Sequence, residues 1–140
     1  MAKFFPVVPG YWTYAKRRGW DEATRTLGVY LLTCTHRNLE GFYCLPMAYA
    51  SEDLGWSANK IRKAMANLIA DGFVEYDAEA SVVLLPGALN HHQPKTTPQL
   101  KGALAQLEDL PATDLQARFV DLAREKCEPL YRALTEGLPA

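Results

Sequence analysis

Residues 50–86, ASEDLGWSANKIRKAMANLIADGFVEYDAEASVVLLP, decide the expected fold. They read as a short helical segment, a Gly55-Trp56 turn, a longer amphipathic helix and two β-prone runs with almost no chain between them. This is the order of a helix-turn-helix followed by a β-hairpin, or wing. In such folds the N-terminal part of the second helix is the surface that enters the major groove of DNA.

The second helix is expected from Ala58 to about Ala70, capped by Ser57 and ended by Asp71-Gly72. At 100° per residue its residues divide into two faces. The apolar face contains Ile61, Ala64, Met65, Leu68 and Ile69. The opposite face carries cations, amides and one small residue but no carboxylate: Asn59, Lys60, Arg62, Lys63, Ala66 and Asn67. These residue types suit contacts with phosphates and base edges, although a merely solvated helix face has a similar composition.

The hypothesis that follows places a set of side chains on DNA. From the second helix these are Ser57, Asn59, Lys60, Arg62, Lys63 and Asn67. Further backbone contacts are expected from basic residues earlier in the chain, namely Lys16, Arg17, Arg18, Arg25 and Arg37, whose placement the sequence does not fix.

The predicted wing has strands at 73–76 and 82–85, joined by the turn 77–81. Asp77 and Glu79 make this tip acidic, which opposes insertion into a minor groove of negative potential. We therefore expect the wing to brace the fold.

The remaining chain favours a mainly α fold with a small β-hairpin sheet. Helices are expected at 11–18, 22–35 and 47–54, with an edge strand at 42–45. Residues 87–98 resemble a connector, and two helices should follow, from 98 to about 108 and from 114 onward, the second interrupted at Pro129. We divide the chain into a winged helix-turn-helix domain with an N-terminal lead-in (1–92) and a connector with a C-terminal helical extension (93–140). The apolar face of this extension must pack on the domain or on a second copy, so a homodimer through these helices is left open.

Charge is distributed unevenly along the 140 residues. Residues 1–63 hold nine Lys or Arg against five Asp or Glu, whereas residues 64–140 hold six against eleven. This asymmetry suits a protein with one face on nucleic acid and another on a partner, although the net charge is only −1. A cytoplasmic protein without membrane association is expected, because there is no long apolar run or signal peptide and the three cysteines form no disulfide framework.

The motifs LLTC-THRN, LGWS and DGFVEYD, within residues 28–89, resemble the N-terminal winged-helix domain of phage replication-initiation, or replisome-organiser, proteins. The resemblance covers roughly residues 4–110. It implies a phage or prophage module that recognises a replication origin or an operator. The chain is too short for the larger helicase-recruiting domain of that family, which leaves transcription regulation open beside DNA replication.

Three functional classes follow. The favoured one is a non-enzymatic protein that binds double-stranded DNA, with no cofactor. The alternative is a protein-interaction module that binds a replisome or host protein and no DNA. The third, a small hydrolase or metalloenzyme, lacks support: His91-His92, His36 and the cysteines do not have structural zinc spacing, and nucleotide-binding and hydrolase motifs are missing.

Overall fold

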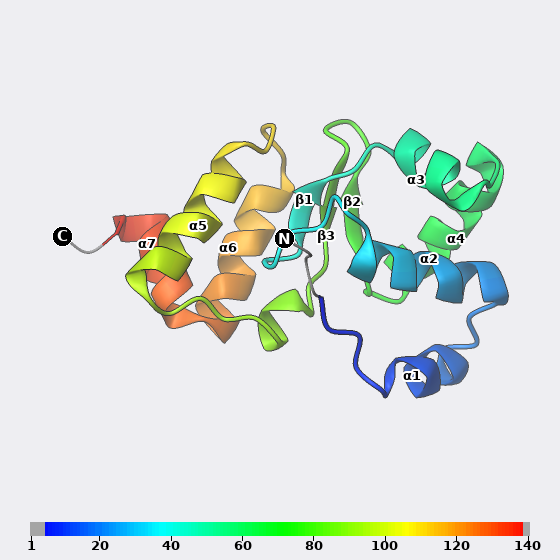
Figure 1. Ribbon diagram of the computed structural model, residues 1–140, viewed down its shortest axis with the longest axis horizontal. Helices are drawn as coiled ribbons and strands as arrows, with labels where there is room; N and C mark the ends of the chain where they lie inside the picture. Colours follow the sequence, from blue (N-terminus) through cyan, green and yellow to red (C-terminus); the bar gives the residue numbers. More distant parts are fainter. Residues whose placement is uncertain (1–4, 139–140) are drawn as a thin grey trace.

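A computed structural model describes residues 5–138. Helices and short strands alternate in its first part, and helices alone make up its last part (Figure 1). The helices are α1 (Tyr11–Arg17), α2 (Glu22–Thr33), α3 (Met47–Leu54), α4 (Ala58–Ala70), α5 (Thr97–Glu108), α6 (Leu115–Lys126) and α7 (Glu128–Glu136). The strands are β1 (Phe42–Cys44), β2 (Glu75–Asp77) and β3 (Val82–Leu84), and a 3₁₀ turn, η1 (Ala88–Asn90), follows them.

The strands form one antiparallel sheet in the order β1-β3-β2. In the central strand Val83 lies opposite Tyr43 on one side and Tyr76 on the other. The chain therefore runs from α2 through β1 to the pair α3–α4 and then into the hairpin β2–β3. This arrangement confirms the predicted mainly α fold with a small hairpin sheet, in which α4 is the second helix of a helix-turn-helix.

Local chemistry sets the turn between α3 and α4. Gly55 ends α3 in the left-handed region at φ 69°, where a residue without Cβ is least strained. The Ser57 hydroxyl then accepts a hydrogen bond from the Lys60 backbone N–H at 3.2 Å and caps α4. Both helices have the bounds expected from the sequence, and at this turn Gly55 ends the first and Ser57 caps the second.

The sheet separates two hydrophobic cores, since alternate residues of a strand point to opposite faces. Tyr43 and Val83 face a core formed with α1–α4, whereas Phe42, Val82 and Leu84 face a core formed with α5–α7. Figure 1 shows the sheet between these two groups of helices. The rings of Phe42 and Phe119 stack across the second core at a centroid distance of 4.9 Å. The C-terminal extension thus buries its apolar face against the sheet of its own chain.

Within residues 5–138, no helix combines the length and apolar character needed to cross a membrane. The cysteines are free; Cys34 and Cys127 are buried and Cys44 is exposed.

Candidate nucleic-acid interface

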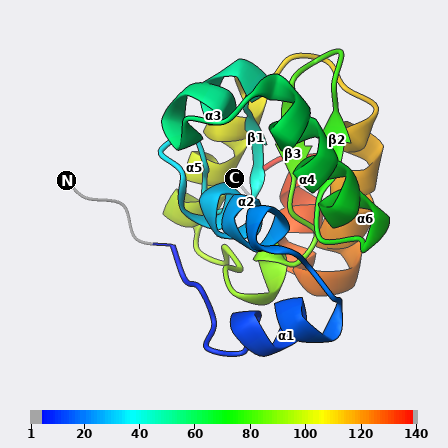
Figure 2. The ribbon, with the colours of Figure 1, turned by 90° about the vertical axis from the view of Figure 1, so that its right-hand side faces the viewer.

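The outer face of α4 presents the predicted cations to solvent, and Figure 2 shows α2, α3 and α4 turned toward the viewer with the C-terminal helices behind them. Lys60, Arg62 and Lys63 are exposed. Lys60 Nζ lies 4.3 Å from the centroid of the Trp56 ring, and the Arg62 guanidinium donates a hydrogen bond to the Asn59 side-chain oxygen. The described ion pairs include none of the three cations.

Asn67 lies on the exposed face of α4, as predicted, and also has a partner within the chain. Its side-chain N–H donates to the hydroxyl of Thr24 in α2 at 3.0 Å. Thr24 is fully buried, and its hydroxyl and backbone N–H also hydrogen-bond the Asp21 carboxylate, which lowers the pKa of that carboxyl. Asn67 therefore joins α4 to α2 while it remains on the exposed helix face predicted from the sequence.

Arg17 and Arg18 lie at the other end of α4 from its capping serine. Arg18 Nη1 is 4.0 Å from Asp71 Oδ1, directly after the helix, and its guanidinium lies over the Tyr14 ring at 5.0 Å. The 13 residues of α4 extend about 20 Å, so these arginines are roughly that far from Ser57. Both remain exposed and able to contact phosphates, but as a separate group.

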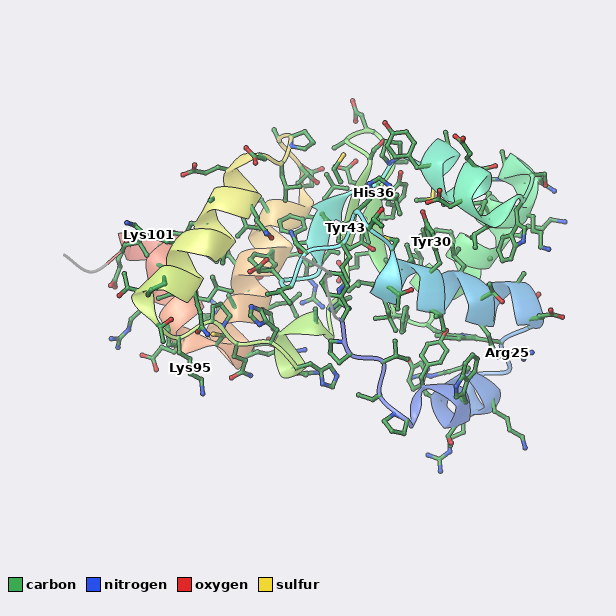
Figure 3. The ribbon with its side chains drawn as sticks, in the orientation of Figure 1. Arg25, Tyr30, His36, Tyr43, Lys95 and Lys101 are labelled. Carbon is green, nitrogen blue, oxygen red and sulfur yellow. The ribbon has the colours of Figure 1, made fainter. Side chains whose placement is uncertain are left out.

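Arg37 is a correction to the predicted site. Arg37 is only 3% exposed, and its Nη1 donates a hydrogen bond to the Leu32 carbonyl at 2.7 Å. Burial lowers the pKa of its guanidinium. It follows α2 in a loop that folds back under the helix end, where DNA has no access to it. Arg25 is also drawn inward, since its Nη1 donates to the Trp20 carbonyl at 2.8 Å (Figure 3).

The wing tip is held by the C-terminal extension. The Thr113 hydroxyl donates to Asp77 Oδ2 at 2.6 Å, and the backbone N–H groups of Glu79 and Ala80 donate to Asp77 Oδ1. The Thr113 hydrogen bond and then the Ala80 N–H lower the pKa of Asp77. Beside it, Arg118 Nε of α6 lies 2.9 Å from Glu75 Oε2. The acidity of the tip thus serves contacts within the chain.

An apolar groove that sequence reasoning missed lies between α3, α4 and β2. Its volume is about 620 Å³. Ile69, expected on the buried arc, is 44% exposed and lines this groove beside Ala66 and Met65. Arg62 forms part of the same wall. The sequence places Ile69 at the edge of the apolar arc of the helix, where the pattern is compatible with a buried or an exposed side chain.

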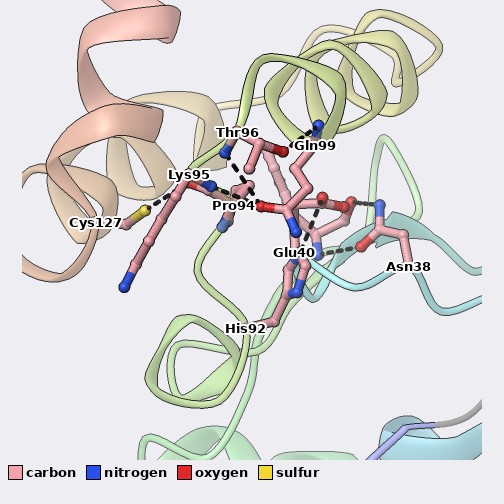
Figure 4. A network of polar contacts seen from close by, with 9 residues as sticks. Asn38, Glu40, His92, Pro94, Lys95, Thr96, Gln99 and Cys127 are labelled. Carbon is pink, nitrogen blue, oxygen red and sulfur yellow. Dashed lines mark hydrogen bonds and ion pairs between the residues drawn. The ribbon is translucent and has the colours of Figure 1, made fainter.

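A polar cluster lies where the loop before β1 meets the loop that leads into α5 (Figure 4). Asn38 exchanges hydrogen bonds with the Phe42 backbone, and Gln99 accepts from the backbone N–H groups of Lys95 and Thr96. Buried Glu40 lies 3.8 Å from His92 Nε2, and burial raises the pKa of its carboxyl. The Glu40–His92 contact joins the loop before β1 to the segment after η1, whereas the Asn38 and Gln99 hydrogen bonds each order their own loop.

In the part of the chain that the structure describes, no group of three or more His, Cys, Asp or Glu side chains is arranged to hold a metal ion. Comparisons with protein-family models, with curated proteins and with solved structures found no match to this chain. The likeness to phage replication-initiation domains therefore rests on the sequence motifs alone.

Proposed function

We propose that this protein binds double-stranded DNA through the exposed face of α4, without catalysing a reaction. The observation that carries the proposal is the cationic face of Lys60, Arg62 and Lys63 on the second helix of a helix-turn-helix. Three arginines of the C-terminal helices, by contrast, have acidic partners. Arg118, Arg124 and Arg132 each lie within 3.1 Å of a carboxylate oxygen, whereas α4 contains no carboxylate.

The residues of α4 suit different contacts. Lys60 and Lys63 are point charges for phosphates, whereas Arg62 and Asn59 have the donor and acceptor geometry that reads base edges. Ala66 and Ala70 are small and exposed, so the helix can approach the floor of a groove closely. Arg17 and Arg18 would contact phosphates farther along the duplex.

The proposed biological role follows the sequence resemblance: recognition of a replication origin or operator of a phage or mobile element, in the cytoplasm. A homodimer would match two DNA half-sites. The C-terminal helices bury Phe119 and Leu130 within the chain, but Tyr131 and Leu134 are only partly buried and would be available to a dimer through these helices. Light scattering of the free and DNA-bound protein would test it.

The test is retention of pooled genomic fragments of the protein's own replicon by the wild type and by Lys60→Ala with Lys63→Ala. Lys95→Ala with Lys101→Ala is the matched control, since both lysines are exposed and lie on the opposite side of the molecule (Figure 3). We expect selective retention by the wild type and the control and its loss in the α4 variant. Equal retention by all three proteins would contradict the proposal.

The apolar groove favours a second function, binding of a replisome or host protein. A groove lined by Met65, Ile69 and Tyr76 offers little to DNA but suits an apolar side chain of a protein partner. Ile69→Glu separates the two functions. It would abolish partner capture under the second function and would only weaken DNA binding through added negative charge under the first.

A further inference from the structure

A second cavity, distinct from the face of α4, lies beneath the N-terminal segment. Its volume is about 510 Å³, within the range of small-molecule sites. Val8, Tyr14, Phe73 and Gly87 line it, and His91 and Arg37 are polar residues of the lining.

Arg37 is the unusual member of this wall. Burying a charged group is costly unless the group is paired and hydrogen-bonded. Its Nη1 has the Leu32 carbonyl as partner, but Nε is buried without a hydrogen-bond partner among the described residues, and no carboxylate there forms an ion pair with it. The Phe5 ring covers one face of the guanidinium at 4.7 Å, which leaves the edges of the guanidinium plane for an anion.

Glu40 does not supply that anion. It is the buried acid whose charge acts on Arg37, yet its ion-pair contact is with His92, and its Oε2 also lacks a hydrogen-bond partner within residues 5–138. Burial favours the neutral form of this carboxyl. The arginine thus carries a buried positive charge without a matching anion in direct contact.

We propose that this cavity binds a small organic anion with a flat apolar body, such as an aromatic carboxylate. The carboxylate would pair with Arg37, and the ring would lie among Tyr14, Phe73 and Val8. Gly72 and Phe73, which also line the cavity, come just after Asp71 at the end of α4, so an occupant would contact the segment that follows this helix. Any effect of the anion on DNA affinity rests on the proposed DNA-binding function. Binding of the anion to the cavity does not depend on that function.

The test is calorimetric titration with 2-naphthoate and with 2-naphthalenemethanol, which share the ring and differ in charge. We expect one molecule of 2-naphthoate per chain and at least about tenfold weaker binding of the alcohol, as expected for loss of a charge-assisted contact. Arg37→Met should weaken 2-naphthoate binding by a similar factor.

Gly87→Phe tests the cavity with Arg37 intact. Gly87 has helical dihedral angles, φ −81° and ψ −7°, and a Cβ built there meets only the Asn90 side chain, at 3.9 Å. The added ring should block the cavity and abolish binding. Gly102→Phe is the matched control, because Gly102 is exposed on α5 and has open space around it. Thermal melting would verify that each variant is folded.

Three results would overturn the proposal: no binding of 2-naphthoate to the wild type at millimolar concentration, equal binding of acid and alcohol, or unchanged binding by folded Gly87→Phe. Weak binding by Arg37→Met and Gly87→Phe with full binding by Gly102→Phe would support it.

Discussion

Asn59 and Asn67 lie on the same helix and on the face that the sequence pattern assigns to DNA, yet their surroundings differ. Both residues are exposed, but the Asn59 side-chain oxygen accepts from Arg62 on its own helix, whereas the Asn67 amide donates to a fully buried threonine of α2. One amide has a partner only one turn away on its own helix in the described chain, and the other connects two helices.

Replacing each of these two residues by alanine should therefore affect a different property of the protein. Asn67→Ala leaves the Thr24 hydroxyl without this donor and should lower the free energy of unfolding by about 1 kcal/mol, with little change in DNA affinity. Asn59→Ala should leave stability nearly unchanged and weaken DNA binding. Urea unfolding and DNA titration of both variants would measure this. A stability loss in Asn59→Ala as large as that in Asn67→Ala would contradict the assignment.

Residue identity alone does not reveal such differences. The wheel pattern correctly placed Lys60, Arg62 and Lys63 on the exposed side of α4, because amphipathic periodicity fixes the buried face. It could not show that Arg37 folds inward, since this residue lies in a loop whose path depends on tertiary packing. For Ile69 the pattern was ambiguous, and its predicted burial was wrong.

At the scale of elements, the wing is attached to α6. The sequence predicted the hairpin and its acidic tip, and β2 begins at Glu75, two residues later than expected, because the Phe73 backbone N–H still hydrogen-bonds Leu68 in the last turn of α4. The partner of the tip could not be predicted, since Thr113 and Asp77 are 36 residues apart and nothing in the pattern links them.

This attachment should weaken in acid. A carboxyl whose pKa is lowered by folding contributes stability above its unfolded pKa of about 3.9 and loses that contribution as pH falls through the folded value. Thr113→Val removes the first cause of the lowered pKa of Asp77. The difference in unfolding free energy between wild type and this variant should therefore be largest near neutral pH and shrink below about pH 4.

Part of that difference should persist in acid, because the Thr113 hydroxyl also accepts from the Leu115 N–H at the start of α6. Thr135→Val is the control: its hydroxyl donates to the Tyr131 carbonyl, with no carboxylate involved. Urea unfolding from pH 3 to pH 7 should give a constant difference for the control. A constant difference for Thr113→Val as well would refute the proposed role of Asp77.

At the scale of the whole molecule, we expect the shared sheet to make the chain one cooperative unit. Every residue of β3 is buried, because helices cover both faces of the strand. The sequence predicted that the extension has an apolar face. It did not show that this face packs on the sheet, because strands of three residues are too short for alternation of apolar and polar residues to reveal a second buried face.

Phe119→Ala tests this coupling. Removing the fully buried ring that stacks on Phe42 should cost about 3–5 kcal/mol. The three tryptophans, Trp12, Trp20 and Trp56, all lie in the α1–α4 half, so their fluorescence reports unfolding of the helix-turn-helix side. The fluorescence midpoint should shift together with that measured by circular dichroism. An unshifted fluorescence midpoint would mean that the two halves unfold independently.

The central claim, that α4 contacts DNA, is tested most directly by the salt dependence of affinity for a duplex. Each phosphate contact made by a lysine contributes roughly 0.9 to the slope of log K against log salt concentration. Lys60→Ala with Lys63→Ala should therefore reduce the slope by about two, while Lys95→Ala with Lys101→Ala leaves it unchanged. A slope equal to that of the wild type in the α4 variant would show that DNA, if bound at all, is bound elsewhere.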